Sequence, residues 1–335
     1  MKRKGLDMKK LLSVLLSTIL IVGSLIGCGS STTKNEDTDK GDNVIRIAAQ
    51  PYPLYTPVYV AYELGYLDEE LEAVGAKYEW KEFKSGPLVN EAVAAGEADL
   101  GFMADLPAII AKSTGQPIEI ISNVAYGEKG LAVLIKPDSK IKSVADLKGK
   151  KVAYATGSYA QHLLALLLSE EGLTLEDVNS VNLAAGDQVA SLANEEVDAI
   201  VIWEQYISQL TSDGQAKVLA DGTGVKRGNM VTYAVTDYAK KNPKIIEAYI
   251  KALNRANETI KNDPEKAAEA VSKDFNVDTE LMLKILDNFE YQTDLTDEDI
   301  SEITKVKDFS LKSGIINKDV DIDSFINKDY LDEVN

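Results

Sequence analysis

The sequence predicts an α/β protein whose folded part forms two lobes, each with a central sheet flanked by helices. Strand-like and helix-like patterns alternate over most of the chain, which is typical of βαβ units. The length of 335 residues suits about two domains. A polar stretch at 138–151 interrupts the alternation, so we expect the chain to cross into the second lobe there and to return near 222–229.

The predicted strands are short apolar or alternating runs. The run 76–83 (AKYEWKEF) alternates polar and apolar residues as a half-buried strand does, and 98–102 is short and apolar as a buried strand is. Strands that alternate with helices favour parallel sheets with helices on both faces. In chain order the predicted strands are 44–49, 76–83, 98–102, 118–124, 131–135, 151–155, 197–203 and 231–235.

The predicted helices carry recognisable start and stop signals. A helix over 57–67 closes at Gly65, and a helix over 85–95 has Ser85 as N-cap and Pro87 in its first turn. Further helices are expected at 105–112 and, strongly apolar, at 158–171; the chain is helical from Pro243 almost to its end.

The composition excludes several classes of function. The chain has 36 Lys and Arg against 54 Asp and Glu, a net charge of −18, which argues against a nucleic-acid partner because phosphates require clustered basic residues. One Cys and one His exclude an intramolecular disulfide, a cysteine-based zinc site and a multi-histidine metal centre. We therefore expect no metal and no cofactor.

The first 27 residues have the pattern of a secretory signal. Five basic residues among the first ten precede an apolar run at 11–26, which is marginal for a stable membrane span. The run ends in Leu25-Ile26-Gly27-Cys28, which resembles the bacterial lipobox, where the cysteine receives a diacylglyceryl group and becomes residue one. Met8 is an alternative start, and an uncleaved anchor helix is the alternative interpretation of the segment.

The sequence thus predicts a signal peptide at 1–27, lipidation at Cys28 and a flexible tether at 28–43. Residues 29–42 are small, polar and charged, as a tether requires. The removed segment carries five basic residues and Asp7, so cleavage changes the net charge to −22. We expect the protein on the extracytoplasmic face of the cell membrane, held there by its lipid.

Several short segments between residue 44 and the C-terminus form a recognisable series. They are Gln50-Pro51, Pro57-Val58-Tyr59-Val60-Ala61, Gly65-Tyr66-Leu67, Ser85-Gly86-Pro87, the stretch 95–101 (AGEADLG), the stretch 143–152 (SVADLKGKKV), Gly157-Ser158 and the stretch 197–203 (VDAIVIW). In their order and spacing these segments resemble the extracytoplasmic substrate-binding proteins for nitrate, sulfonate and taurine.

This resemblance implies a bilobal Venus flytrap of the type II periplasmic-binding-protein class with two hinge crossovers. Lobe 1 would comprise 44–136 and 229–335, and lobe 2 would comprise 137–228. A monomer would bind a small ligand in the cleft and deliver it to an ABC permease and its ATPase. The expected ligand is an aliphatic sulfonate or a taurine-like aminosulfonate. The alternatives are a heteroaromatic ligand, such as a thiamine pyrimidine precursor or a flavin-type compound, and, more remotely, an enzyme on the same fold.

Two predicted helix starts supply a candidate anion site. Gly157-Ser158 opens an apolar helix, whose first backbone N–H groups lack partners, and the hydroxyls of Thr156 and Ser158 add donors. Ser85-Gly86 repeats the arrangement in the first lobe. Ordinary helix capping is the alternative role for these residues.

Polar and aromatic residues complete the prediction. Glu204 and Asp105 follow strand ends, where they act either as caps or as partners of a ligand ammonium group, and His162 is expected to be a buried structural residue. The aromatic candidates are Tyr52, Tyr55, Tyr126, Tyr159, Trp203 and Tyr233. No residue is assigned a catalytic role, and the ligand contacts predicted are Gln50, Tyr52, Ser85, Gly86, Asp105, Thr156, Gly157, Ser158, Tyr159, Trp203 and Glu204.

Overall fold

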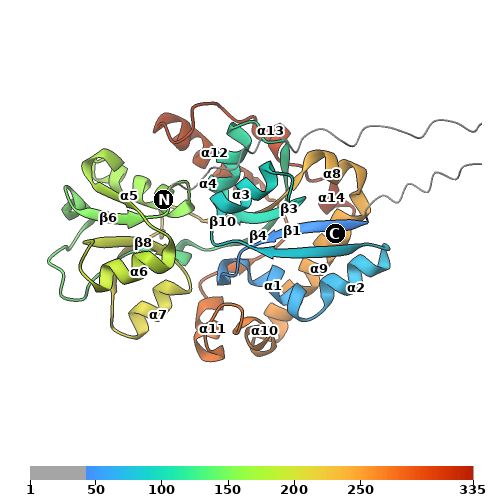
Figure 1. Ribbon diagram of the computed structural model, residues 1–335, viewed down its shortest axis with the longest axis horizontal. Helices are drawn as coiled ribbons and strands as arrows, with labels where there is room; N and C mark the ends of the chain where they lie inside the picture. Colours follow the sequence, from blue (N-terminus) through green and yellow to red (C-terminus); the bar gives the residue numbers. More distant parts are fainter. Residues whose placement is uncertain (1–42, 335) are drawn as a thin grey trace, which may run out of the picture. The chain divides into compact units, whose positions relative to one another are not determined.

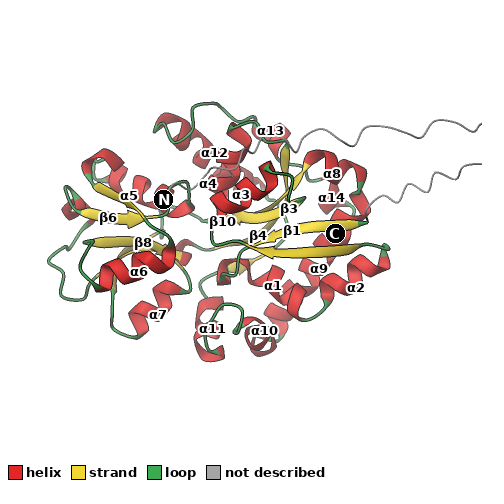
Figure 2. Cartoon of the chain, in the orientation of Figure 1, coloured by secondary structure: helices red, strands yellow, loops and turns green. Residues whose placement is uncertain are grey.

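The computed structural model describes residues 43–334. The chain divides into two units, 1–41 and 42–335, and the fold below is that of the second unit. The predicted signal peptide, Cys28 and nearly all of the predicted tether lie outside the described residues. Two sheets flanked by helices make up the unit, as Figures 1 and 2 show, so the predicted α/β class with two sheets is confirmed.

The first sheet has six strands in the order β11-β4-β10-β3-β1-β2. Strands β1, β2, β3 and β4 run in one direction, whereas β10 runs antiparallel to both β3 and β4. The short β11 is antiparallel to β4 at the edge. The strand bounds are β1 Val44–Ala49, β2 Lys77–Glu82, β3 Leu100–Ala104, β4 Ile118–Tyr126, β10 Asn229–Val235 and β11 Glu290–Tyr291.

The second sheet has five strands in the order β7-β6-β8-β5-β9. Strands β6, β7 and β8 are parallel, and β5 is antiparallel to its neighbours β8 and β9. The strand bounds are β5 Leu131–Ile135, β6 Lys151–Tyr154, β7 Asn179–Asn182, β8 Ala199–Trp203 and β9 Lys217–Asp221.

The two connections between the sheets show that the predicted position of the first crossing and the predicted parallel sheets are both wrong. The chain leaves the first sheet after Tyr126 and enters the second at Leu131, so the expected crossing at 138–151 is wrong by one strand. It returns through 222–228, as expected. Connections this short cannot carry the chain around to the far end of the next sheet. Strands β5 and β10 therefore enter against the direction of their neighbours, and both sheets are mixed rather than parallel.

Fourteen α-helices of the described residues flank the sheets. The predicted helix over 57–67 is two helices, because Gly65 adopts the left-handed conformation (φ 74°) between them. The predicted starts at Gly86, Asp105 and Tyr159 are correct to within a residue. Helices flanking the first sheet are α1 Thr56–Glu63, α2 Tyr66–Ala73, α3 Gly86–Ala94, α4 Asp105–Ser113, α8 Thr236–Lys241, α9 Pro243–Asn262, α10 Pro264–Val271, α11 Thr279–Leu286, α12 Asp297–Lys312, α13 Ile322–Phe325 and α14 Asp329–Asp332; those of the second are α5 Tyr159–Glu170, α6 Ala185–Ala193 and α7 Tyr206–Ser212.

Burial explains which predicted elements were easy to find. The 20-residue helix α9 buries Ile246, Tyr249, Ile250 and Leu253, spaced three and four residues apart, against α1 and α2. By contrast, β7 and β9 are short edge strands without a fully buried residue, and the sequence analysis missed both.

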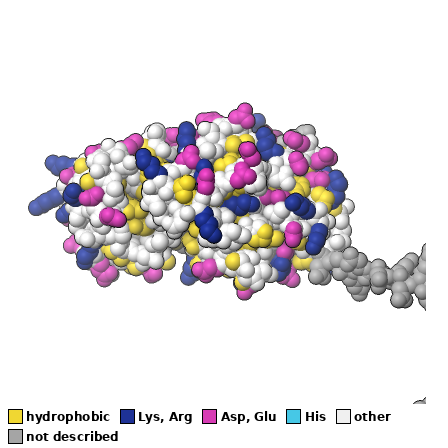
Figure 3. Space-filling model, turned by 90° about the horizontal axis from the view of Figure 1, so that it is seen from above, with side chains coloured by type: hydrophobic (Ala, Val, Ile, Leu, Met, Phe, Trp, Pro, Cys, Tyr) yellow, Lys and Arg dark blue, Asp and Glu magenta, His cyan; other side chains and the backbone are white. Residues whose placement is uncertain are grey.

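The surface shows no segregation of charge on the face drawn in Figure 3, where Lys and Arg side chains are interspersed with Asp and Glu. None of the helices within residues 43–334 is both long enough and apolar enough to cross a membrane. Within the same residues, no group of three or more His, Cys, Asp or Glu side chains is placed to hold a metal ion.

Candidate functional site

A small cavity of about 20 Å³ lies between the two sheets. It forms where β1, β3 and β8 end and where helices α3 and α5 begin, which is the position at which open α/β sheets bind ligands. No charged side chain is among the residues that line it. These are Gln50, Tyr52, Leu54, Tyr55, Ser85, Gly86, Ala104, Pro107, Ser158, Tyr159 and Trp203.

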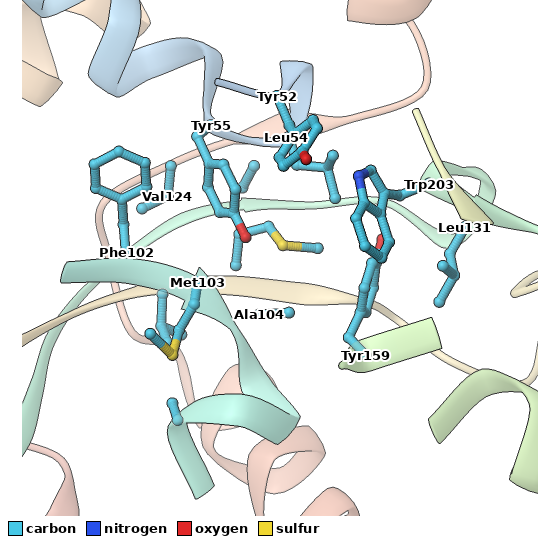
Figure 4. Packing of buried hydrophobic residues seen from close by; sticks show 14 of the residues in the cluster. Tyr52, Leu54, Tyr55, Phe102, Met103, Ala104, Val124, Leu131, Tyr159 and Trp203 are labelled. Atoms are coloured by element: carbon cyan, nitrogen blue, oxygen red, sulfur yellow. The ribbon is translucent and has the colours of Figure 1, made fainter. Parts of the chain in front are cut away.

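Aromatic rings from both sheets form one side of the cavity. The ring of Tyr52 meets that of Trp203 edge-on at 5.5 Å between centroids, and Figure 4 shows Tyr159 on the far side of Trp203 from Tyr52. The hydroxyl groups are held by backbone carbonyls: Tyr52 donates to Lys84 (2.8 Å) and Tyr159 donates to Gly130 (3.3 Å). Burial raises the pKa of both tyrosines, so both remain neutral.

Helix α3 begins at the cavity with Ser85 as its N-cap. The backbone of Ser85 is extended, but its side chain makes no capping hydrogen bond. Pro87 occupies the second position of the helix and has no N–H to satisfy. The N–H of Gly86, the first residue of the helix, donates to no acceptor among the described residues. Two donors at this helix start, the Ser85 hydroxyl and the Gly86 N–H, are thus available to a ligand.

Helix α5 begins at the opposite side of the cavity. Here the Ser158 hydroxyl is in use, because it donates to the Ala155 carbonyl (2.6 Å) and accepts from the N–H of Ala160 (3.2 Å). The N–H of Tyr159 has no acceptor within the described chain. A Cβ atom built on Gly157 would lie 3.5 Å from Cγ of Pro87, so the two helix starts face each other directly.

Trp203 adds a further donor. The side chain is 5 % exposed, and its indole Nε1–H is buried without an acceptor among the residues described. Helix starts also concentrate positive potential from their aligned peptide dipoles. The cavity therefore combines uncharged N–H and O–H donors with an apolar lining, so it offers hydrogen-bond donors to an anion but no cationic side chain.

Asp105 and Glu204 do not line the cavity, contrary to the predicted contacts. Both oxygens of Asp105 accept hydrogen bonds from Nζ of Lys226, at 2.9 and 2.7 Å. Glu204 accepts from the N–H and hydroxyl of Ser208 (3.0 and 2.8 Å) and from Asn288 (3.1 Å), while burial raises its pKa. Each of these residues is only 1–2 % exposed. Their carboxylates therefore depend on hydrogen bonds within the protein, and these bonds are made.

Two further predicted contacts hold the loop before α5 rather than face the cavity. The exposed Thr156 donates its N–H to Asn182 (3.0 Å), and Gly157 donates to Gln161 (2.8 Å). The structure thus brings together seven of the eleven predicted residues and leaves out Asp105, Thr156, Gly157 and Glu204. The seven are Gln50, Tyr52, Ser85, Gly86, Ser158, Tyr159 and Trp203.

Four lining residues were absent from the predicted contacts: Leu54, Tyr55, Ala104 and Pro107. Tyr55 was among the aromatic candidates, and Ala104 lies between the predicted strand 98–102 and the predicted helix 105–112, but neither signal separates a lining residue from a core residue. The other aromatic candidates lie elsewhere. Tyr126 packs under the guanidinium of Arg227 at 3.6 Å, and the fully buried Tyr233 donates to Asn90.

A family model and two curated relatives place this chain in the same protein family. Residues 52–267 match the family model described as "NMT1/THI5 like". A protein of Bacillus subtilis (strain 168) is 28% identical over 97% of this chain and 96% of its own length. One of Escherichia coli (strain K12) is 31% identical over 64% of this chain and 67% of its own length. Both carry the name "Putative aliphatic sulfonates-binding protein".

A solved structure extends the similarity to the fold. The alkanesulfonate-binding protein SsuA from Xanthomonas axonopodis pv. citri, bound to MOPS, superposes with a TM-score of 0.77. The two chains are 25% identical, and the match covers 85% of this chain and 98% of the other. The predicted bilobal binding-protein fold is thereby confirmed.

Proposed function

Because this chain belongs to the NMT1/THI5-like family, we propose that it is an extracytoplasmic solute-binding protein that carries an aliphatic sulfonate to an ABC importer. The observation that carries this proposal is the uncharged donor set at the cavity, supplied by helix starts from both lobes. A ligand held by Gly86 of one lobe and Tyr159 of the other stabilises the closed arrangement of both.

The chemistry of the cavity suits a sulfonate. A sulfonate carries one negative charge at every physiological pH and presents three acceptor oxygens, so it needs several donors and no proton of its own. The free N–H groups of Gly86 and Tyr159, the Ser85 hydroxyl and the Trp203 indole provide such donors. The alkyl part of the ligand would lie against Leu54, Ala104 and Pro107, which line the same cavity.

Among sulfonates we expect simple alkanesulfonates to bind more tightly than taurine. An ammonium group buried in the cavity requires an acceptor or a counter-charge. The two carboxylates predicted for that role are occupied, Asp105 by Lys226 and Glu204 by Ser208 and Asn288. Taurine would therefore lose hydration of its ammonium group without regaining a partner.

A heteroaromatic ligand is the second candidate, because aromatic rings form much of the wall. Against it stands the direct edge contact between Tyr52 and Trp203 at 5.5 Å, which leaves no slot for a third ring between them. A catalytic function has weaker support. The one histidine of the chain, His162, is buried in a hydrogen bond with Lys226 and is not free to act as a base.

Titration calorimetry on the mature chain without its lipid tests the proposal. The panel is ethanesulfonate, butanesulfonate, taurine, nitrate and a hydroxymethyl pyrimidine. Acetate and bis-tris serve as buffers, because the common zwitterionic buffers are sulfonates and would compete. We expect the alkanesulfonates to bind most tightly, and taurine at least tenfold more weakly. Binding of the pyrimidine alone would overturn the sulfonate assignment.

The membrane attachment is a separate part of the proposal. Two acyl chains on Cys28 would anchor the protein stably, since each buried CH₂ contributes about 0.8 kcal/mol. Cys28→Ala should abolish palmitate labelling and release the protein into the medium. A variant that stays at the membrane would show that the lipid is not the anchor.

A further inference from the structure

A buried lysine on the return crossing connects the two lobes. Lys226 lies in the connection 222–228 and is 4 % exposed. Its Nζ donates to both oxygens of Asp105 and forms a hydrogen bond of 2.9 Å with Nδ1 of His162. Asp105 begins α4 beside the first sheet, and His162 belongs to α5 beside the second. One ammonium group therefore ties both sheets to the hinge.

This cluster lies directly behind the wall of the ligand cavity. Asp105 follows the lining residue Ala104, and His162 is one turn after the lining residue Tyr159. The ammonium of Lys226 lies 5.6 Å from the ring centroid of Tyr159. Any movement that separates Asp105 from His162 also separates the walls of the cavity that they adjoin.

We propose that Lys226 is a positioning residue that latches the two lobes in the closed arrangement, and that the latch forms only with neutral His162. The inference rests on the proposed function, because ligand binding would be what closes the lobes. It predicts that binding releases a proton at mildly acidic pH. Ligand affinity then falls as the solution becomes more acidic.

The hydrogen bond fixes the protonation state that the latch needs. All three protons of the Lys226 ammonium are donors, so Nδ1 of His162 accepts and the ring proton is on Nε2. A second proton on the ring would place two cations 2.9 Å apart in a buried site. Burial, and then the charge of Lys226, hold the pKa of His162 well below its ordinary range.

The charged groups around the imidazole of His162 do not neutralise the positive charge that a second ring proton would add. Asp105 from α4 already pairs with Lys226, Arg227 of the crossing pairs with Glu298 and Asp299, and Lys305 of α12 pairs with Glu302. One cavity is bordered by His162 together with Asp105, Lys226, Arg227, Glu302 and Lys305. The ring of Phe309 also borders it, with its centroid 5.3 Å from that of the imidazole. The Nε2 atom has no acceptor among the described residues, so no free carboxylate faces the imidazole.

The direction and size of the pH effect follow from linkage. With the lobes apart, we expect His162 to be hydrated and to titrate near 6.5, whereas the closed state keeps it neutral. Closure is therefore fully favourable above that pH and weakens below it. The affinity for butanesulfonate should fall about tenfold between pH 7.5 and 5.5. The ligand does not contribute, because a sulfonate stays ionised over this range.

Two variants separate the latch from a structural role. His162→Gln keeps an acceptor for Lys226 but cannot titrate, so its affinity at pH 7.5 should be within about twofold of the wild type and independent of pH. Lys226→Met removes the bridge and should weaken binding about tenfold or more at every pH. The matched control is Arg46→Met, which breaks the bidentate pair with Asp99 inside the first lobe. That change should alter stability without altering affinity or its pH dependence.

The closing experiment measures the distance between the lobes. Spin labels at the exposed Glu72 of α2 and Asn194 at the end of α6, in the mature chain with Cys28→Ala, report closure by pulsed electron resonance with and without butanesulfonate. We expect the wild-type distance to lengthen at pH 5.5 and that of His162→Gln to stay constant. Equal pH responses of these two proteins, in distance or in affinity, would overturn the latch. Absence of sulfonate binding by the wild type would instead overturn the proposed function, and the ligand-free distances would still test the latch.

Discussion

Helices α3 and α5 begin on opposite sides of one cavity, and each has a serine as its N-cap. The hydroxyl groups of the two serines differ in their hydrogen bonds. Ser158 is 4 % exposed, and its hydroxyl bonds Ala155 and Ala160 within its own helix start. Ser85 is half-buried and makes no capping bond. The difference shows that a helix start can use its cap for stability or leave it for a ligand. Pro87 permits the second choice, because it removes one of the N–H groups that a cap would satisfy.

The sharpest test of this comparison is Ser85→Ala. A hydrogen bond to a charged group contributes about 1.5–3 kcal/mol, so the affinity for butanesulfonate should fall about 10- to 100-fold. The free energy of unfolding should stay within about 0.5 kcal/mol of the wild type, because no internal bond is lost. Calorimetry and urea denaturation measure the two quantities. A stability loss without an affinity loss would mean that Ser85 is an ordinary cap.

The neighbouring Gly86→Ala tests how closely α3 is packed at the cavity. A Cβ atom there would lie 2.8 Å from Cγ of Pro107, which is part of a rigid ring on α4. We expect a loss of about 1–3 kcal/mol in the free energy of unfolding. Gly186→Ala in the first turn of α6 is the matched control, because nothing lies within 4 Å of its Cβ. Urea denaturation should rank the two clearly, and equal stabilities would refute the close contact.

The smallest effect is expected from Ser158→Ala. The change removes the acceptor of the Ala160 N–H, and loss of such a cap costs about 1 kcal/mol of unfolding free energy. Thermal denaturation measures that loss, and calorimetry should show a smaller decrease in affinity than for Ser85→Ala. The roles assigned to the two serines would be reversed if Ser158→Ala impaired binding more than Ser85→Ala did.

The sequence predicted the parts of the site that depend on local pattern. Ser85, Ser158 and Trp203 stand at the ends of strands or helices, and such ends are visible as changes of hydrophobic period and as capping residues. In a sheet whose parallel strands end on one side, these positions converge without further information. Ser85, Gly86, Ser158 and Trp203 were predicted in this way, whereas Gln50 came from the family resemblance and Tyr52 and Tyr159 from the aromatic candidates.

Two of the four predicted residues that the cavity leaves out are held by partners far along the chain. Asp105 is occupied by Lys226, 121 residues later, and Glu204 is occupied by Asn288, 84 residues later. No local pattern announces such a pairing, so a carboxylate at a strand end cannot be distinguished from one that faces a ligand. The strand 131–135 has the same difficulty: its apolar run indicates a strand, but only its pairing with β8 and β9 assigns it to the second sheet.

The uncharged lining of the cavity has a consequence for delivery. A buried ion pair would hold an anion through a field that persists at a distance, whereas N–H and O–H dipoles act only at contact and with water excluded. When the lobes separate, water supplies equivalent hydrogen bonds to the sulfonate, and the cavity no longer binds it tightly. Binding and release of the ligand would then correspond to the closed and open positions of one hinge. No competing charged group would be needed to transfer the sulfonate to the permease.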